Sequence, residues 1–222
     1  FLQLDPRGAI ITNVEADHLD YYGSFEAIEE AFSRFVDRVE DDGLLVIGPD
    51  VSEVVEMSAG CEVWRLGKDV NIELLGERQG RFRFRVCGPK WATPEVVLKV
   101  AGEFNVENAA LAISLAVGLA SRGGKIDATA AAMRAAQGIM EFEGVERRFE
   151  LWGEEDDVRV YHDYAHHPTE VRVTLEMARR VLPKRELHVI FQTHQHSRTA
   201  RFLRDFVESL RAADRVIVAD VY

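Results

Sequence analysis

The sequence predicts an α/β protein whose main sheet is mostly parallel and carries added antiparallel strands. Buried-strand runs alternate with helical spacings over residues 9–66 and again over 158–218. Such alternation is typical of a parallel sheet whose strands are joined by helices. Between these stretches, residues 70–100 alternate apolar and polar side chains with a period of two, which is typical of antiparallel strands with one wet face.

Composition and charge indicate a soluble, cytoplasmic protein. The chain has 222 residues, 47% of them hydrophobic, which is enough for one large domain or two small ones. A net charge of −11 disfavours the basic face that nucleic-acid binding needs. The longest apolar run, residues 109–120, is too short to span a membrane, and no secretory signal is present. Cys61 and Cys87 lack metal-ligand spacing, so we expect reduced thiols.

The first part of the chain alternates between expected strands over 9–14, 44–48 and 62–66, a helix over 25–39, and a short helix from Asp50. Ser24 is a suitable N-cap for the longer helix. In the period-two segment, the alternating arginines at 81, 83 and 85 predict the solvated face of a strand. An alanine-rich helix is expected from about 102 to 121, and Asp127 is expected to cap a helix that ends near 137.

A linker expected over residues 138–144 divides the chain into domains of residues 1–144 and 145–222. The second domain is expected to contain strands over 147–152, 157–162, 186–191 and 216–222, with helices over 171–181 and 200–212. Its second strand should pair with its first, and Pro168 suits the first turn of a helix. The chain lacks an initiator methionine and closes on a strand and its exit loop, so we expect a fragment of a longer protein.

Polar loops follow three of the expected strands, at residues 15–20, 163–170 and 192–199. In open α/β sheets, ligands bind at the carboxyl ends of the strands. The two loops of the second domain are expected to leave the same edge of one parallel sheet. Because the third loop belongs to the first domain, the sequence predicts a site between the domains.

The residue types in these loops fit two classes of enzyme. One is an ATP-dependent ligase in which arginines clamp phosphates or carboxylates; the candidate clamps are Arg147, Arg148 and Arg198. Since Arg147 and Arg148 are expected to alternate on a strand, only one of them should face the site. The other class is a metal-dependent hydrolase, with candidate ligands His18, His166, His167, His194 and His196.

Five motifs then narrow the choice, and they are Thr12–Asp20, Asn105–Ala109, Arg147–Glu150, Asp163–Glu170 and His194-x-x-Ser197-Arg198-Thr199. In this order, across nearly the whole chain, they resemble the Mur ligase family. The resemblance implies that residues 1–144 are the latter part of the family's central ATPase domain. Residues 145–222 would be the first half of its Rossmann-like C-terminal domain.

The resemblance also implies an activity. It predicts an ATP- and Mg²⁺-dependent, ADP-forming acid–amino-acid ligase of peptidoglycan precursor synthesis, and hence a role in cell-wall biogenesis, cell shape and cell division. Within the family, the motifs favour the joining of L-alanine to UDP-N-acetylmuramate through an acyl phosphate. The related reaction that adds a recycled tripeptide to the same UDP-sugar remains an alternative.

Roles for individual residues follow from the same resemblance. His18 matches the family's Mg²⁺-binding histidine, and Arg148 matches an arginine at the ATP phosphates. Asn105 and Asn108 match an asparagine pair near the adenine, and Asp163 matches the acidic residue at the ribose. The positions implied around the amino acid and the muramoyl group are Tyr164, His166, His167, His194 and Arg198. The residues implied to act in catalysis are His18, Arg148, His166 and His194.

Departures from the family pattern qualify this assignment. The sequence contains no Gly-x-x-Gly-Lys-Thr phosphate loop, so the chain alone is expected not to hydrolyse ATP. Phe104 stands where a histidine is usual, and Ala165 replaces a usual glycine. Gln195 replaces a usual arginine, which removes one substrate clamp and weakens the case for L-alanine.

Overall fold

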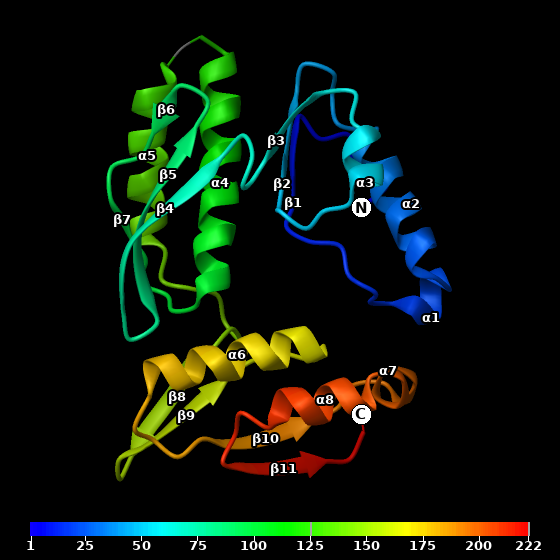
Figure 1. Ribbon diagram of the computed structural model, residues 1–222, viewed down its shortest axis with the longest axis vertical. Coiled ribbons are helices and arrows are strands. Elements are labelled where there is room, and N and C mark those ends of the chain that lie inside the picture. Colours follow the sequence, from blue (N-terminus) through cyan, green and yellow to red (C-terminus); the bar gives the residue numbers. More distant parts are fainter. Residues whose placement is uncertain (125, 222) are drawn as a thin grey trace. The chain divides into compact units, whose positions relative to one another are not determined.

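A computed structural model of the chain describes residues 1–124 and 126–221 and divides them into two compact units. Unit 1 comprises residues 1–76, 82–98 and 104–142, and unit 2 comprises residues 77–81, 99–103 and 143–222. Tyr222, the last residue of the expected strand and exit loop over 216–222, lies outside the described residues. The two units are α/β structures with parallel and antiparallel strands, as the sequence predicts (Figure 1).

A three-stranded parallel sheet forms the centre of unit 1. It consists of β1 (Gly8–Ile11), β2 (Leu44–Ile47) and β3 (Glu62–Arg65), in that order. All four residues of β2 are buried, because helices cover both faces of the sheet. On one face lie α2 (Phe25–Val36) and α3 (Glu53–Met57), whose apolar side chains pack on the strands.

The ends of these two helices test the expected boundaries. Ser24 caps α2 as predicted, because its hydroxyl oxygen accepts the backbone N–H of Ala27 at 3.2 Å. The helix ends at Val36, three residues earlier than expected. The expected start of α3 at Asp50 is wrong, since Ser52, an extended residue, occupies the N-cap position.

Helix α4 (Glu103–Arg122) packs on the other face of the parallel sheet. Gly118 allows this close approach, because a Cβ there would lie 2.1 Å from Leu44 Cδ2 and 3.0 Å from the Trp64 ring. Helix α4 has 20 residues, and by length and composition alone it could cross a membrane. The uninterrupted apolar run within it, residues 109–120, is shorter. Its buried residues belong to the core of unit 1, as is usual for the core helix of a soluble protein.

The period-two segment forms a second sheet in unit 1, made of β4 (Asn71–Arg78), β5 (Arg81–Gly88), β6 (Trp91–Ala92) and β7 (Val96–Val97). Strand β5 pairs antiparallel with β6 and β7, as expected. Its phenylalanines are buried, whereas Arg83 and Arg85 form surface ion pairs with Glu95 and Glu73, which confirms the solvated face.

Helix α5 (Ala128–Glu141) contacts the short strands of this second sheet. Asp127 caps it as predicted, accepting the backbone N–H of Ala130 at 2.9 Å. The helix continues four residues past its expected end near 137, so the expected linker over 138–144 is partly helical.

Unit 2 contains two separate two-stranded sheets. Strands β8 (Glu150–Glu155) and β9 (Val158–His162) pair as expected, and they do so as an antiparallel hairpin, whereas β10 (His188–Gln192) pairs parallel with β11 (Arg215–Ala219). Among the described residues β9 does not pair with β10, so the single parallel sheet expected for this domain is wrong.

Three helices complete unit 2: α6 (Pro168–Val181), α7 (His196–Arg201) and α8 (Leu203–Leu210). Apolar residues of α6 and α8 pack on Phe191 of β10. The expected continuous helix over 200–212 is instead two helices, and it begins earlier. Phe202, with φ −104° and ψ 19°, breaks it, and the ring of Phe202 packs edge-on against that of His167 at 5.1 Å.

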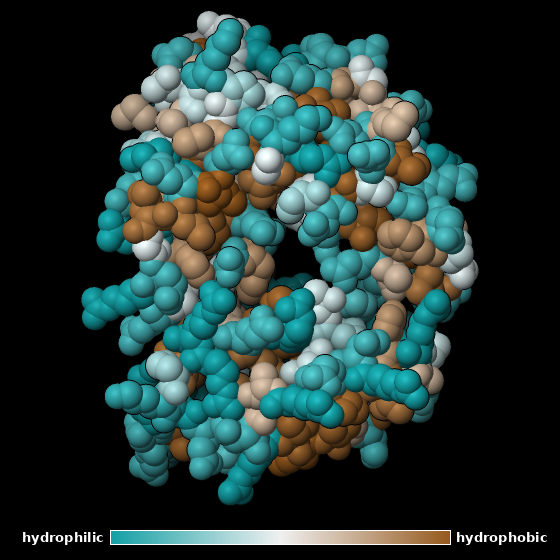
Figure 2. All heavy atoms as spheres, in the orientation of Figure 1, coloured by the Kyte–Doolittle hydropathy of each residue, from teal (hydrophilic) through white to brown (hydrophobic). Residues whose placement is uncertain are grey.

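The second face of the β10–β11 sheet is open to solvent. Figure 2 shows hydrophobic residues gathered over this region, and the paired residues Ile190 and Ile217 are exposed. A hollow lined by residues of both strands lies here, away from the polar turns that follow β9 and β10.

The close approach at Gly118 leads to a prediction about stability. Gly118→Ala should lower the free energy of unfolding, because overpacking costs about 1–3 kcal/mol, whereas alanine gains roughly 1 kcal/mol over glycine in a helix. Gly138→Ala, in α5, is the matched control, since a Cβ there meets no atom within 4 Å. That variant should gain about 0.5–1 kcal/mol. Urea unfolding followed by far-ultraviolet circular dichroism measures both, and an equal gain in the two variants would contradict the proposed contact.

Candidate functional site

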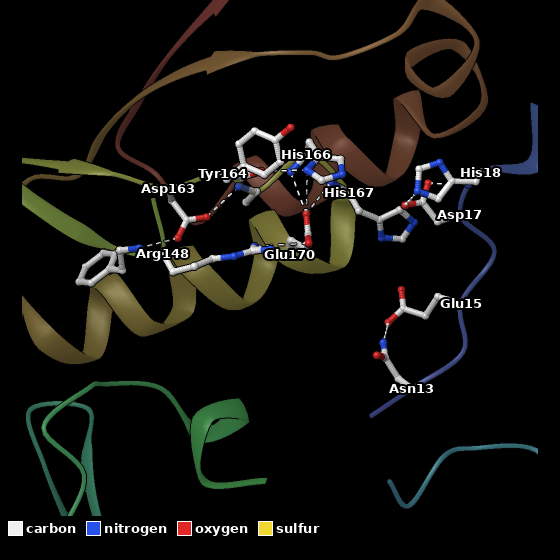
Figure 3. A network of polar contacts seen from close by, with 12 residues as sticks. Asn13, Glu15, Asp17, His18, Arg148, Asp163, Tyr164, His166, His167 and Glu170 are labelled. Atoms are coloured by element: carbon white, nitrogen blue, oxygen red, sulfur yellow. Dashed lines mark hydrogen bonds and ion pairs between the residues drawn. The ribbon is translucent and has the colours of Figure 1, made fainter. Parts of the chain in front are cut away.

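The polar turn between β9 and α6 is held by the carboxylate of Glu170. Pro168 is the first residue of α6, as predicted, and Glu170 stands in the first turn. Its Oε2 accepts the backbone N–H of His166 at 2.9 Å and that of His167 at 3.2 Å (Figure 3). No individual role was expected for Glu170 from the sequence, although a glutamate three residues after an N-cap is a recognised capping signal.

Arg148 reaches the same carboxylate. Its Nη1 lies 3.5 Å from Glu170 Oε1, and its side chain is half exposed, so the guanidinium also faces solvent. Burial by itself would raise the pKa of Glu170, but the N–H of His166, the charge of His166, the N–H of His167 and the charge of Arg148 together lower that pKa. The carboxylate is therefore kept ionised.

Asp163 joins two turns of the chain. Its Oδ1 accepts the backbone N–H of Ala165, and its Oδ2 accepts that of Phe149, each at 2.8 Å. A carboxylate offers about four lone-pair positions, so both oxygens can still accept hydrogen bonds from a ligand. In addition, the backbone N–H of Tyr164 donates to the carbonyl oxygen of Arg147 at 2.7 Å.

Arg147 and Arg148 do not alternate on a strand, contrary to expectation, because β8 begins only at Glu150. They lie in a turn in which Arg147 has φ 60° and Phe149 has φ 50°. A left-handed conformation costs about 1–2 kcal/mol for a residue with a Cβ, so this turn is strained on both sides of Arg148. Such strain often marks functional sites.

The two histidine-rich turns of unit 2 lie close together. The ring centroids of His166 and His194 are 6.5 Å apart, although their strands belong to different sheets. The Nδ1 of His166 lies 2.9 Å from the carbonyl oxygen of Tyr164. Because a carbonyl oxygen only accepts, Nδ1 carries the hydrogen in this contact. Tyr164 and His194 are exposed, whereas Arg198 is buried.

In unit 1, His18 and Asp17 form the polar end of the loop that follows β1. His18 adopts a left-handed conformation at φ 52°, and its Nε2 lies 3.6 Å from Asp17 Oδ2. The backbone N–H of His18 donates to Asp17 Oδ1 at 2.7 Å. No group of three or more metal-ligating side chains gathers within residues 1–124 and 126–221.

Asn105 and Asn108 lie in the first turns of α4. Asn105 is partly buried and Asn108 is exposed. Of the expected site residues, His18, Asn105 and Asn108 lie in unit 1, and the others lie in unit 2. Their functional roles stay predictions.

Comparison with known proteins identifies the family of both halves. The protein-family model for the Mur ligase middle domain matches residues 1–116. The family model described as Mur ligase, glutamate ligase domain matches residues 147–221. The UDP-N-acetylmuramate–L-alanine ligase of Arthrobacter sp. (strain FB24) is 39% identical over 227 residues, covering all of this chain and 47% of that protein.

Two solved structures extend the comparison. The UDP-N-acetylmuramate–alanine ligase of Thermotoga maritima aligns with 100% of this chain and 47% of its own, at a TM-score of 0.74 and 28% identity. A murein peptide ligase from Psychrobacter arcticus 273-4 aligns with 98% of this chain and 44% of its own, at a TM-score of 0.64 and 26% identity. The chain thus spans about half the length of the relatives it matches. These matches argue against the metal-dependent hydrolase.

The lowered pKa of Glu170 predicts how stability depends on pH. An acid whose pKa is depressed by folding stabilises the fold above its unfolded pKa of about 4.3, and this contribution disappears as the pH falls through the folded pKa. Glu170→Gln should therefore lose about 0.3–1 kcal/mol at pH 7, because a negative charge near a helix N-terminus is worth that amount. The loss should shrink towards pH 3.

Glu176→Gln is the matched control for this measurement, since Glu176 lies on the same helix in an exposed ion pair with Arg172. Its effect should stay within about 0.5 kcal/mol. Urea unfolding between pH 3 and pH 7 measures both variants. A loss in Glu170→Gln that grows as the pH falls would contradict the assigned pKa direction.

Proposed function

The chain belongs to the Mur ligase family, and on that premise we propose that it supplies part of a cytoplasmic, ATP-dependent ligase that joins L-alanine to UDP-N-acetylmuramate. The observation that carries this proposal is the match of the whole chain to proteins described as UDP-N-acetylmuramate–L-alanine ligases. The five motifs occur along the same residues. The proposed reaction forms an acyl phosphate and ADP, and the amine of L-alanine then displaces phosphate.

The residues of the first loop fit a magnesium ion. Mg²⁺ is usually bound through one or two carboxylates and keeps water and substrate phosphates as its other ligands. Asp17 and His18 offer a carboxylate and an imidazole side by side. In this proposal His18 would hold Mg²⁺, which when bound offsets the charge of the transferred phosphoryl group.

Contacts to the nucleotide are proposed for four residues. Asn105 and Asn108 are proposed near the adenine, Asp163 at the ribose and Arg148 at the phosphates. The support for Arg148 is its half-exposed guanidinium and its position between the two strained residues of the turn. Phosphoryl transfer requires positioned cations rather than a covalent nucleophile, which suits these residue types.

The acceptor and the muramoyl group would contact the histidine-rich turns of unit 2. Proposed contacts are Tyr164, His166, His167, His194 and Arg198. The proximity of His166 and His194 supports a common role. Because Arg198 is buried, we propose that its guanidinium supports the turn from within as well as facing the substrate.

The ligation of a recycled tripeptide to the same UDP-sugar is the second candidate. Two observations favour it: the structural similarity to a murein peptide ligase, and Gln195 in place of a usual arginine. Gln195 is the N-cap residue of α7 and has φ 69°, so its side chain belongs to the turn between β10 and α7.

A first prediction separates these two reactions. In a protein that carries this chain together with the segments of its full-length relatives, phosphate release should require ATP, Mg²⁺, UDP-N-acetylmuramate and L-alanine. Turnover only with L-Ala-γ-D-Glu-diaminopimelate would support the recycling reaction instead. If neither L-alanine nor the tripeptide supports phosphate release, both proposals are contradicted.

A second prediction concerns residues 1–222 alone. This sequence lacks the phosphate loop that, in the family, binds the phosphates of ATP. The purified chain should therefore release no phosphate from ATP above the rate of a buffer blank. A malachite-green assay with and without Mg²⁺ measures this. ATP turnover that persists through a second purification step would show that the chain needs no such loop.

A further inference from the structure

The turn around Arg148 holds a backbone conformation that its own residues do not favour. Arg147 and Phe149 both have positive φ, at 60° and 50°, and neither is glycine. A residue with a Cβ adopts this conformation only when its surroundings impose it. The direction of the Arg148 side chain therefore depends on whatever holds its two neighbours.

Carboxylates hold both neighbours. Oε2 of Glu150 accepts the backbone N–H of Arg147 at 2.8 Å, and Oδ2 of Asp163 accepts that of Phe149 at 2.8 Å. Hydrogen bonds to an ionised acceptor are about twice as strong as those between neutral groups. Each strained residue thus has its own charged acceptor, one local in sequence and one fourteen residues away.

Glu150 is itself fixed in position. The same Oε2 atom lies 3.3 Å from Nε1 of Trp152, which can donate to it, and Glu150 pairs with His162 in the β8–β9 ladder. The Trp152 ring in turn packs against the His162 ring, with centroids 4.2 Å apart. The Glu150 carboxylate that accepts the Arg147 N–H is therefore also held by the β8–β9 hairpin.

The turn directs Arg148 along α6 towards Glu170 (Figure 3). This long side chain would otherwise sample many rotamers. Because the backbone is held on both sides, the Cα–Cβ bond of Arg148 has a fixed position and direction beside the turn that carries His166. Preorganisation of this kind lowers the cost of binding an anion.

We propose that Glu150 is a positioning residue that acts through Arg148, by holding the left-handed conformation of Arg147. This inference rests on the proposed function, in which Arg148 binds the phosphates of ATP. Glu150 contacts neither nucleotide nor acceptor in this proposal. A purely structural role, in which Glu150 only stabilises the hairpin, is the outcome to distinguish.

Steady-state kinetics of the full-length ligase provide the first test. Glu150→Ala should raise the KM for ATP about tenfold or more, since displacing a binding group by about 1 Å can cost about 100-fold. Glu154→Ala is the matched control, because it removes an exposed ion pair with Arg159 from the same strand, away from the turn. It should leave the KM for ATP unchanged.

A double-mutant cycle identifies the route of the effect. If Glu150 acts through Arg148, Glu150→Ala should change the KM for ATP by less than about twofold in an Arg148→Lys background, because coupled residues are not additive. An effect of Glu150→Ala that remains complete in that background would overturn the proposal. So would a lowered melting temperature with an unchanged KM.

Amide hydrogen exchange of residues 1–222 supplies a readout that needs no activity. The Arg147 amide should exchange faster in Glu150→Ala than in the wild type, and it should be unchanged in Glu154→Ala. Equal protection in all three would overturn the proposed hold on the turn. A different result is that the wild-type ligase is inactive while the Arg147 amide still exchanges faster in Glu150→Ala. That result would contradict the proposed function but support the hydrogen bond between Glu150 and Arg147.

Discussion

The carboxylate of Glu170 is the interaction on which the polar turn of unit 2 depends. It accepts the backbone N–H groups of His166 and His167 and lies beside the guanidinium of Arg148. The N-terminus of α6 adds its positive dipole, so the charge is stabilised where backbone donors would otherwise lack partners. Turn, helix and arginine are thereby held by one group.

Carboxylates also accept backbone N–H groups around the turn that carries Arg148. Glu150 and Asp163 accept backbone N–H groups on either side of it, and Asp163 also binds the turn before α6. An ionised carboxylate suits this use, because it has several lone pairs and makes strong hydrogen bonds. The carboxylates of Glu150, Asp163 and Glu170 therefore have a structural role in these two turns.

Rigid turns are consistent with the chemistry proposed for a Mur ligase. Phosphoryl transfer and attack on an acyl phosphate both gain most from cations and acceptors already in place, because rearrangement during the reaction would raise the barrier. The strain at Arg147 and Phe149 fits this requirement. It is retained because the surrounding hydrogen bonds outweigh it.

The sequence alone determined the parallel strands of unit 1, the Ser24 and Asp127 caps and the β8–β9 hairpin, because periodicity and caps depend on neighbours a few residues apart. Motif order likewise determined the family. Only the tertiary structure decided the turn at Arg148, the break at Phe202 and the separation of β9 from β10. The turn at Arg148, for example, depends in part on the hydrogen bond between Phe149 and Asp163, which lie fourteen residues apart, and the spacing of neighbouring residues does not reveal such a contact.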